Sequence, residues 1–325
     1  MRSHHPLRAV ATAILIAASV FASAYAQNWP SRTVRIIVPF GPGGGTDTIA
    51  RVVADKLQDS IGQTFIVENR PGATSNVGAS IVAKAPADGY TLLLITSSVS
   101  INQAMPGKKP FDTIRDFEPV VRIGSSAVMI GGNAEFPVAS IPQLVAYAKA
   151  HPGKISYAVC AIGGPQHMAG ELLKMMAGID IVHVAYKGCA QAVPDVLSGQ
   201  VPVTISTVGN LAPHIKAGKM KAYAVTAARR SSFAPDVPTV AESGFADFDI
   251  DVWFGMLAPA GTPKEIVARL NAETNRILDR AEMRDKMASQ NFEVIGGSSE
   301  AFGEVIRKEI SRYSRIIQAA GIRSE

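Results

Sequence analysis

This sequence of 325 residues has little net charge and only two cysteines. Lysine and arginine number 32 against 27 acidic residues, so a net charge of +5 provides no basic tract for binding a nucleic acid. The 28 glycines and 20 prolines are too few and too scattered for a fibrous or low-complexity chain. With 47% hydrophobic and 18% charged residues, the composition is globular, and the length predicts about two domains.

Several catalytic and cofactor motifs are also missing. No G-x-S-x-G or S-x-x-K sequence supports acyl transfer by a serine. No Gly-Lys-Ser/Thr sequence forms a Walker loop, and Thr46 occupies the last glycine position of a dinucleotide motif that would start at Gly41. We therefore expect no cofactor and no enzymatic activity. We also expect no metal site, because no H-E-x-x-H pattern includes the histidines of the later chain, His151, His167, His183 and His214.

The first 26 residues are typical of a secretion signal. Arg2 and Arg8 form a positive region, residues 9–24 are apolar or small, and Ala24-Tyr25-Ala26 is a cleavage sequence. The apolar run is shorter than the roughly 20 residues of a membrane span. We therefore expect a periplasmic protein that begins at Gln27 after cleavage. In that oxidising compartment, Cys160 and Cys189 either form a disulfide or remain two buried thiols.

Strand-like and helix-like segments alternate along the chain, which predicts an α/β fold with parallel strands. The C-terminal part is mostly helical, with a capping box over 262–265. Its last helix carries an apolar stripe and is expected to tie the C-terminus onto the first part of the fold. The predicted strands are 34–39, 64–68, 90–95, 127–130, 155–159, 181–186, 201–206 and 222–226. The predicted helices before residue 200 are 46–57, 77–85, 141–151, 166–177 and 190–198.

Two glycine loops, one in each strand–helix series, carry the functional signal. The first runs from Phe40 to Asp47, and the second from Cys160 to Gln166. Glycines allow a close backbone approach, and the first amides of the following helix have no partner within the helix. Together with the helix dipole they form a nest for a carboxylate or a phosphate. Either loop alone is better explained by a tight turn, but the pair, in an exported protein, suggests a clamp around a small anion.

The residues around these loops resemble the Bug family, the periplasmic substrate-binding proteins of tripartite tricarboxylate transporters. The resemblance continues over nearly the whole mature chain in the order expected for the family. Segments that carry it are 38–47, 67–73, 88–93, 167–172, 182–188, 213–218, 236–242, 253–255 and 258–263.

The resemblance implies a two-lobed type II periplasmic binding protein, a Venus flytrap with its ligand in the cleft between the lobes. Lobe one would hold residues 27–125 and 227–325, and lobe two residues 126–226. The ligand would be a small aliphatic dicarboxylate or aromatic carboxylate, passed by a monomeric receptor to a membrane permease. The ligand contacts implied in lobe one are Phe40, Gly43, Gly44, Thr46, Asp47, Thr96, Ser97 and Ser98. Those in lobe two are Ala161, Ile162, Gly163, Gly164 and Gln166, with His167, Ser206 and Thr207 as further candidates.

Some roles stay open at this point. Ser206-Thr207 stands where the family often has Asp-Asn, which removes a negative charge from that end of the site. Asp47 either orders its own loop or contacts the ligand, and we favour the first because a bare carboxylate would repel an anion. Trp253 and Phe254 are expected to pack between the lobes. The alternatives to a transport receptor are a hydrolase-like periplasmic enzyme and a sensor that docks on a membrane kinase.

Overall fold

The computed structural model describes residues 29–159, 162–186 and 189–322, with the side chains of 189 and 190 left out. The expected signal peptide, Ala161 and the pairing of Cys160 with Cys189 therefore lie outside the described residues.

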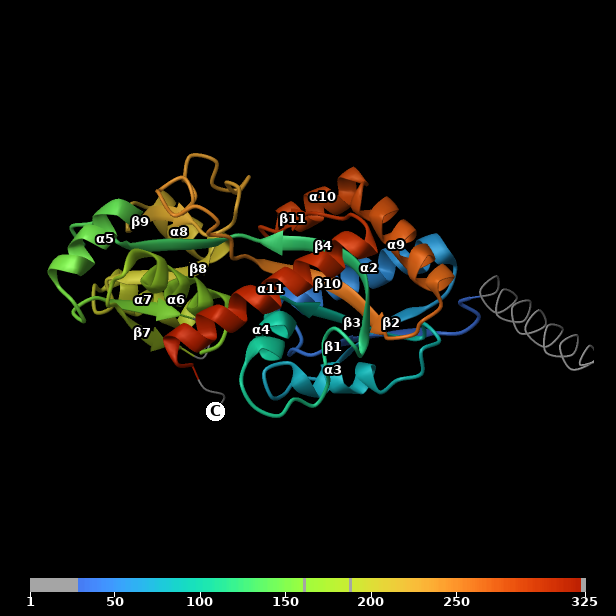
Figure 1. The fold of residues 1–325 in the computed structure, drawn as a ribbon. Helices are drawn as coiled ribbons and strands as arrows, with labels where there is room; N and C mark the ends of the chain where they lie inside the picture. Colours follow the sequence, from blue (N-terminus) through green and yellow to red (C-terminus); the bar gives the residue numbers. More distant parts are fainter. Residues whose placement is uncertain (1–28, 160–161, 187–188, 323–325) are drawn as a thin grey trace, which may run out of the picture.

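Two β-sheets, each covered by helices, make up the two halves of the molecule (Figure 1). The strand order is β11-β4-β10-β3-β1-β2 in the first sheet and β7-β6-β8-β5-β9 in the second. The strands are β1 (Val34–Val38), β2 (Phe65–Asn69), β3 (Thr91–Thr96), β4 (Phe117–Ser126), β5 (Val128–Asn133), β6 (Ser156–Val159), β7 (Val182–Ala185), β8 (Val203–Thr207), β9 (Met220–Val225), β10 (Val252–Pro259) and β11 (Glu293–Val294). The helices are α2 (Gly45–Ile61), α3 (Asn76–Ala83), α4 (Ser98–Ala104), α5 (Ile141–Ala150), α6 (Pro165–Ala177), α7 (Cys189–Leu197), α8 (Val208–Lys216), α9 (Lys264–Leu278), α10 (Ala281–Ala288) and α11 (Ser299–Ala320).

Both sheets are mixed rather than wholly parallel. The strands β1, β2 and β3 are parallel, as are β6, β7 and β8. In the first sheet β10 pairs antiparallel with both β3 and β4, and in the second β5 pairs antiparallel with β8 and β9. The sequence pattern located the parallel strands but missed β4 and β10. The fold class is nevertheless the predicted one, an α/β fold in two lobes.

The chain passes from the first sheet to the second between β4 and β5, with only Ala127 between the two strands. It returns between β9 and β10. The side chains of Val240, Phe248 and Ile250 lie in the core of the second half, together with residues of β5, β6 and β8. The exact boundaries of the two lobes stay a prediction, and this packing favours a return crossing near residue 251.

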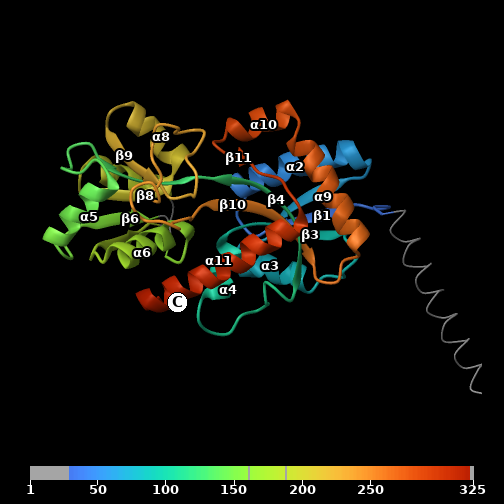
Figure 2. The same cartoon turned by 45° about the horizontal axis from the view of Figure 1, so that its top comes forward.

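The last helix, α11, extends across both halves (Figures 1 and 2). Phe302 and Ile306 near its start pack with β3 and β10 in the first half. Tyr313, Ile316 and Ile317 near its end instead join the core of the second half, where α6 lies. The expectation that this helix ties onto the first part alone is therefore wrong for its second half, since its apolar stripe is long enough to serve two cores.

Two local predictions fail for identifiable reasons. The capping box at 262–265 does not form, because the Thr262 hydroxyl donates to the Pro259 carbonyl and α9 begins after Pro263. Trp253 does not pack between the halves, because it is buried in the core of the first half, edge-on to Phe302 at 5.0 Å. Phe254 packs there too, against Phe292 at 4.9 Å.

Candidate functional site

The first glycine loop leads from the end of β1 directly into α2. Gly43 has a positive φ of 81°, which favours glycine, and Gly44 is the N-cap in an extended conformation. No side chain caps the helix, so its first amides have no side-chain partner. Gly43 and Gly44 are exposed, whereas Thr46 and Asp47 are buried at the start of the helix. The loop thus has the geometry expected of an anion nest.

Asp47 orders this loop from within. Its carboxylate accepts the Gly43 N–H at 2.9 Å, the Arg51 guanidinium at 3.0 Å and the Asn69 amide at 2.9 Å. Asn69 also donates to the Phe40 carbonyl at 3.1 Å. Burial acts to raise the pKa of Asp47, but the hydrogen bonds from Arg51, Gly43 and Asn69 and the charge of Arg51 lower it overall. These bonds favour the loop-ordering role of Asp47, and the absence of a ligand contact stays a prediction.

The second glycine loop has the same backbone geometry with different chemistry. Gly163 has a φ of 72°, Gly164 is an extended N-cap, and no side chain caps α6. The Gly163 N–H donates to His167 Nδ1 at 3.1 Å, four residues ahead, as Gly43 does to Asp47. Burial, together with the nearby His183, lowers the pKa of His167 to about 4, so the ring is neutral and accepts this bond. Gln166 is buried beside it.

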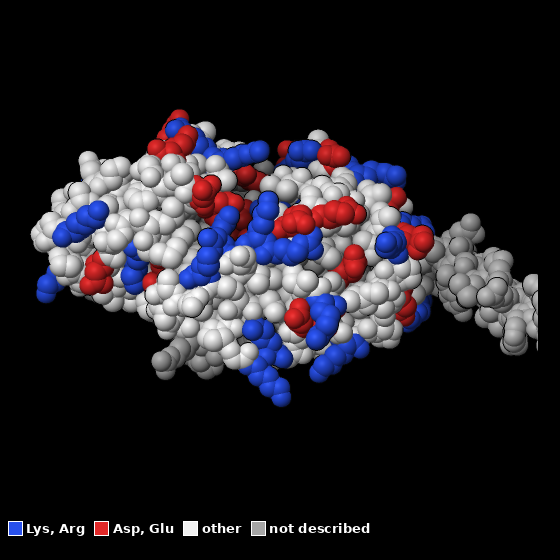
Figure 3. Space-filling model, viewed as in Figure 1, with Lys and Arg blue, Asp and Glu red and all other residues white. Residues whose placement is uncertain are grey.

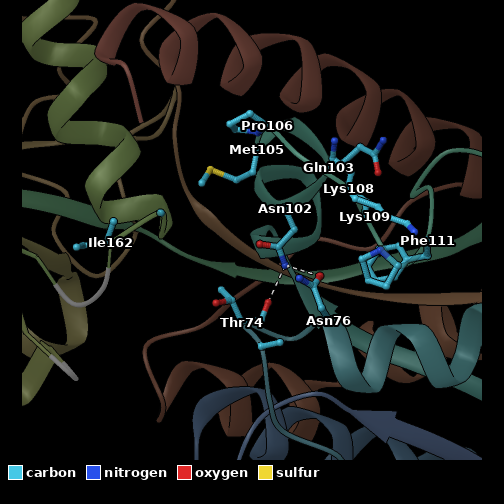
Figure 4. Close-up of a pocket in the computed structure, with 13 residues that line it drawn as sticks. Thr74, Asn76, Asn102, Gln103, Met105, Pro106, Lys108, Lys109, Phe111 and Ile162 are labelled. Atoms are coloured by element: carbon cyan, nitrogen blue, oxygen red, sulfur yellow. Dashed lines mark hydrogen bonds between the residues drawn. The ribbon is translucent and has the colours of Figure 1, made fainter. Parts of the chain in front are cut away.

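A cavity of about 260 Å³ lies between the halves and is shown in Figure 4. From the second half, Ile162 and Gly163 form one wall. The facing walls come from the loop before α3 and from α4 with the segment after it. These first-half residues are Ala73, Thr74, Asn76, Asn102, Gln103, Met105, Pro106, Lys108, Lys109, Pro110 and Phe111. The second glycine loop therefore faces the opposite half across a shared opening, whereas Gly43 and Gly44 do not line this cavity.

The loop from Ala73 to Asn76 is the main part of the site that the sequence analysis missed. Ala73, Thr74 and Ser75 all have positive φ values, of 44°, 49° and 75°, which is unusual for residues other than glycine. Asn102 holds them in place by donating to the Thr74 carbonyl at 2.6 Å and to Asn76 (Figure 4), and it also donates to the Ser75 hydroxyl. A strand, a polar loop and a helix follow one another here as in the glycine loops, and that pattern was the available signal.

The predicted residues Thr96, Ser97 and Ser98 lie behind this loop. The Thr96 hydroxyl bonds with that of Ser98 at 3.0 Å, and Ser98 lies 3.3 Å from the Ser75 hydroxyl. Ser97, fully buried, bonds through its backbone N–H to Trp253. All three hydroxyl residues are buried, and Ser98 contacts the Ala73–Asn76 loop through Ser75, whereas Ser97 bonds to the carbonyls of Trp253 and Asp251.

The remaining candidates lie near a second contact between the halves. Ser206 is buried at the end of β8 and accepts from Asn210, and Thr207 is the N-cap of α8. A side chain added at Gly209 would come within 3.2 Å of Asn291, and one added at Gly45 within 2.8 Å of Phe292. The segment 291–292 therefore lies between the first glycine loop and the start of α8, which brings Ser206-Thr207 to the same side of the molecule as the first loop.

The chain was compared with known proteins. Residues 49–322 match the model of the tripartite tricarboxylate transporter family receptor. This chain belongs to that family. The receptor is 34% identical to the protein BugT of Bordetella pertussis, over 97% of either chain.

Solved structures of related proteins match this chain over most of its length. The Rhodopseudomonas palustris protein Rpa4515 with adipate is 36% identical, covers 91% of this receptor and 99% of its own chain, and has a TM-score of 0.77. MatC of the same organism, with bound malate, is 30% identical, covers 89% and 100%, and has a TM-score of 0.73.

The family is one of periplasmic receptors. Within the part of the chain that the structure describes, no helix is both long and apolar enough to cross a membrane.

Proposed function

We propose that this receptor captures a small carboxylate in the cavity between its two halves and delivers it to a membrane permease. Its mature chain would begin at Gln27 in the periplasm and act as a monomer. The observation that carries the proposal is the cavity itself, which has walls from both halves and lies at the starts of α3 and α6. A volume of about 260 Å³ is below the roughly 300–1,000 Å³ of drug-sized ligand sites, so the guest is small.

The charge around the cavity favours an anion. Lys108 and Lys109 line it, and none of its described lining residues is acidic. In the described structure neither lysine has an ion-pair partner. The N-terminus of α6 adds partial positive charge on the opposite wall, whereas the first amides of α3, those of Asn76 and Val77, donate to the carbonyls of Ala73 and Gly72. A carboxylate therefore gains attraction from both walls without meeting a negative group.

The related structures narrow the chemistry. Relatives at 36% and 30% identity hold adipate and malate, which are both aliphatic dicarboxylates. We extend that class to this receptor, with Lys108 and Lys109 near one carboxylate and the Ile162–Gly163 loop near the other. Closure of the halves would bring Gly43, Gly44 and Thr46 toward the ligand, because binding favours the conformation that makes contacts on both sides.

The enzyme alternative receives no support from the cavity lining. The described residues that line it include no histidine, cysteine or carboxylate that would form a nucleophile–base pair. A sensor for a membrane kinase would bind the same ligand in the same way, so only a test of uptake distinguishes the two roles.

Ligand binding is tested by thermal shift and calorimetry with adipate, malate and benzoate, with adipamide as the uncharged match for adipate. A carboxylate at a hundred times its Kd should stabilise the protein by about 2.7 kcal/mol, and adipamide should not. If adipamide or a sugar stabilises the protein as well as any carboxylate does, the anion proposal fails. Loss of uptake of the bound carboxylate in a deletion strain would then separate transport from sensing.

Two variants locate the site. Asn102→Ala removes the bonds that hold the Ala73–Asn76 loop, and Lys109→Met removes a charge from the cavity wall. Each should weaken carboxylate binding at least tenfold, while Lys149→Met on α5, outside the cavity, should leave it unchanged. Unchanged affinity in both variants would place the ligand elsewhere.

A further inference from the structure

A group of metal-ligand side chains lies behind the second glycine loop. His167 and Glu171 are four residues apart on α6 and so lie on one face of that helix. His183 on β7 joins them, and one ligand atom from each residue lies within 4.8 Å of the other two. No motif in the sequence revealed this, because the third residue comes from a neighbouring strand.

We propose that His167, Glu171 and His183 bind a divalent transition-metal ion such as Zn²⁺. Two imidazoles and one carboxylate are a donor set that suits Zn²⁺, Co²⁺ or Ni²⁺ rather than Mg²⁺ or Ca²⁺. The proposal is independent of the carboxylate-binding function.

One ring nitrogen in this group is buried without a partner and becomes a metal ligand once its proton moves to the other nitrogen. His167 is 1% exposed, and its Nε2 atom is buried without a hydrogen-bond partner among the described residues. An unpaired buried polar atom is costly and needs an explanation. Nε2 lies 3.7 Å from Glu171 Oε1, and the rings of His167 and His183 are 4.5 Å apart. If the three ligand atoms lay 4.8 Å from one another, a metal ion at their centre would be about 2.8 Å from each. A movement of each side chain by about 0.7 Å toward the ion would then give metal–ligand bonds of normal length.

Neighbouring side chains hold the Glu171 carboxylate in place, and a surface groove gives a metal ion access to it. The Tyr157 hydroxyl and the Lys174 ammonium both donate to Glu171 Oε1, at 2.8 and 2.9 Å. In the described structure Oε2 has no hydrogen-bond partner and is free to bind a metal. Such partners of a metal ligand fix its orientation. Glu171 and Lys174 also line a surface groove of about 340 Å³ between α6 and α11, which is open to solvent on that side.

Metal binding has a consequence for the second glycine loop. At present Nδ1 of His167 accepts the Gly163 N–H, so the ring proton is on Nε2. A metal on Nε2 moves that proton to Nδ1 and leaves the ring neutral. The Gly163 N–H then faces another donor and must turn away. The ion and the present bond between Gly163 and His167 therefore exclude each other.

The site is tested with the metal alone, on the chain purified without a polyhistidine tag and stripped with EDTA. Co²⁺ should bind with one equivalent per chain and give visible absorption bands, and Zn²⁺ should displace it. His183→Gln and Glu171→Gln should each weaken Zn²⁺ binding at least tenfold, with circular dichroism confirming that both variants fold. His151→Gln, a histidine on the exposed end of α5, should bind as the unchanged protein does. No binding, or full binding by the folded His183→Gln variant, would overturn the proposal.

A second measurement tests the effect on the loop. Long-range ¹H–¹⁵N spectra of the histidine rings should show the proton of His167 on Nε2 without metal and on Nδ1 with Zn²⁺. The Gly163 amide resonance should shift at the same time. A His167 ring that keeps its proton on Nε2 when Zn²⁺ is bound would contradict coordination through that atom.

Discussion

The two glycine loops have the same backbone conformation but use different side chains as hydrogen-bond acceptors. In each, a left-handed glycine is followed by an extended N-cap glycine, and the first glycine's amide bonds to a side chain four residues ahead. That side chain is the carboxylate of Asp47 in the first loop and the neutral ring of His167 in the second. Asp47 needs Arg51 and Asn69 to complete its bonding, whereas His167 leaves Nε2 unpaired.

This difference shows that the turn requires a hydrogen-bond acceptor four residues after its left-handed glycine. Either a carboxylate or a neutral imidazole ring meets that requirement. A charged acceptor beside a site for anions is acceptable only when a cation balances it, and Arg51 does so. A neutral acceptor needs no such balance and can take on a second role. The four predictions below test this comparison, beginning with the largest expected effect.

Asp47→Ala should destabilise the first loop strongly. The Gly43 amide, Arg51 and Asn69 all lose their shared acceptor, which should lower the free energy of unfolding by about 2–3 kcal/mol. Urea unfolding measures this change. Asp55→Ala on the exposed face of the same helix is the matched control, with an expected loss below about 0.5 kcal/mol. Equal losses in the two variants would show that Asp47 does not order the loop.

Glu309 on α11 provides the contrast of a buried carboxylate for which no ion pair is seen within the described residues. Burial and the nearby Asp251 raise its pKa to about 8, although its bond with the Trp253 indole opposes this. The unfolded chain releases this proton near pH 4.5 and the folded chain near pH 8, so stability falls as the pH rises between those values. Glu309→Gln should remove this loss, about 2 kcal/mol between pH 5 and pH 6.5. Urea unfolding at both pH values measures it, and a slope that persists in the variant would contradict the prediction.

Gly43→Ala and Gly163→Ala should affect the two loops equally. Both residues have a positive φ, and open space surrounds the position of an added side chain, so only the backbone strain of about 1 kcal/mol applies. Gly178→Ala at the end of α6 has the same conformation and open space, and should cost the same. Only the loop variants should also weaken carboxylate binding. A loss of affinity in Gly178→Ala would mean that strain alone, rather than the loops, controls binding.

Gly44→Ala should have the smallest effect. Gly44 has a φ of −77° and its nearest neighbour would be 3.8 Å away, so alanine should change stability by less than about 0.5 kcal/mol. Gly45→Ala should cost more, because its side chain would come within 2.8 Å of the Phe292 ring. Thermal unfolding of the pair measures this difference, and the reverse order would show that Phe292 moves aside freely.

Local pattern was enough to locate the glycine loops and their helices, because strand, glycine and helix signals follow one another within about fifteen residues. The loop-ordering role of Asp47 also followed, since repulsion of an anion is a local argument. The Ala73–Asn76 loop was missed because its left-handed residues are not glycines and depend on Asn102, a distant partner. Likewise His183 meets His167 only through the pairing of β7 with β6, and no spacing along the chain encodes that.

Helix α11 packs against both halves of the molecule. Figure 3 shows acidic and basic side chains mixed over the middle of this face, and the crevice there includes Arg122, Asp251, Lys308 and Arg312. Arg122 pairs with Asp251 at 2.5 Å, and Arg312 donates to the Asp249 carbonyl. Any swing of the halves must either bend α11 or slide Ile316 and Ile317 along α6. Because α11 contacts both halves, closure on a ligand must be accompanied by one of these movements, and a dye pair with one label on each half would report each capture event.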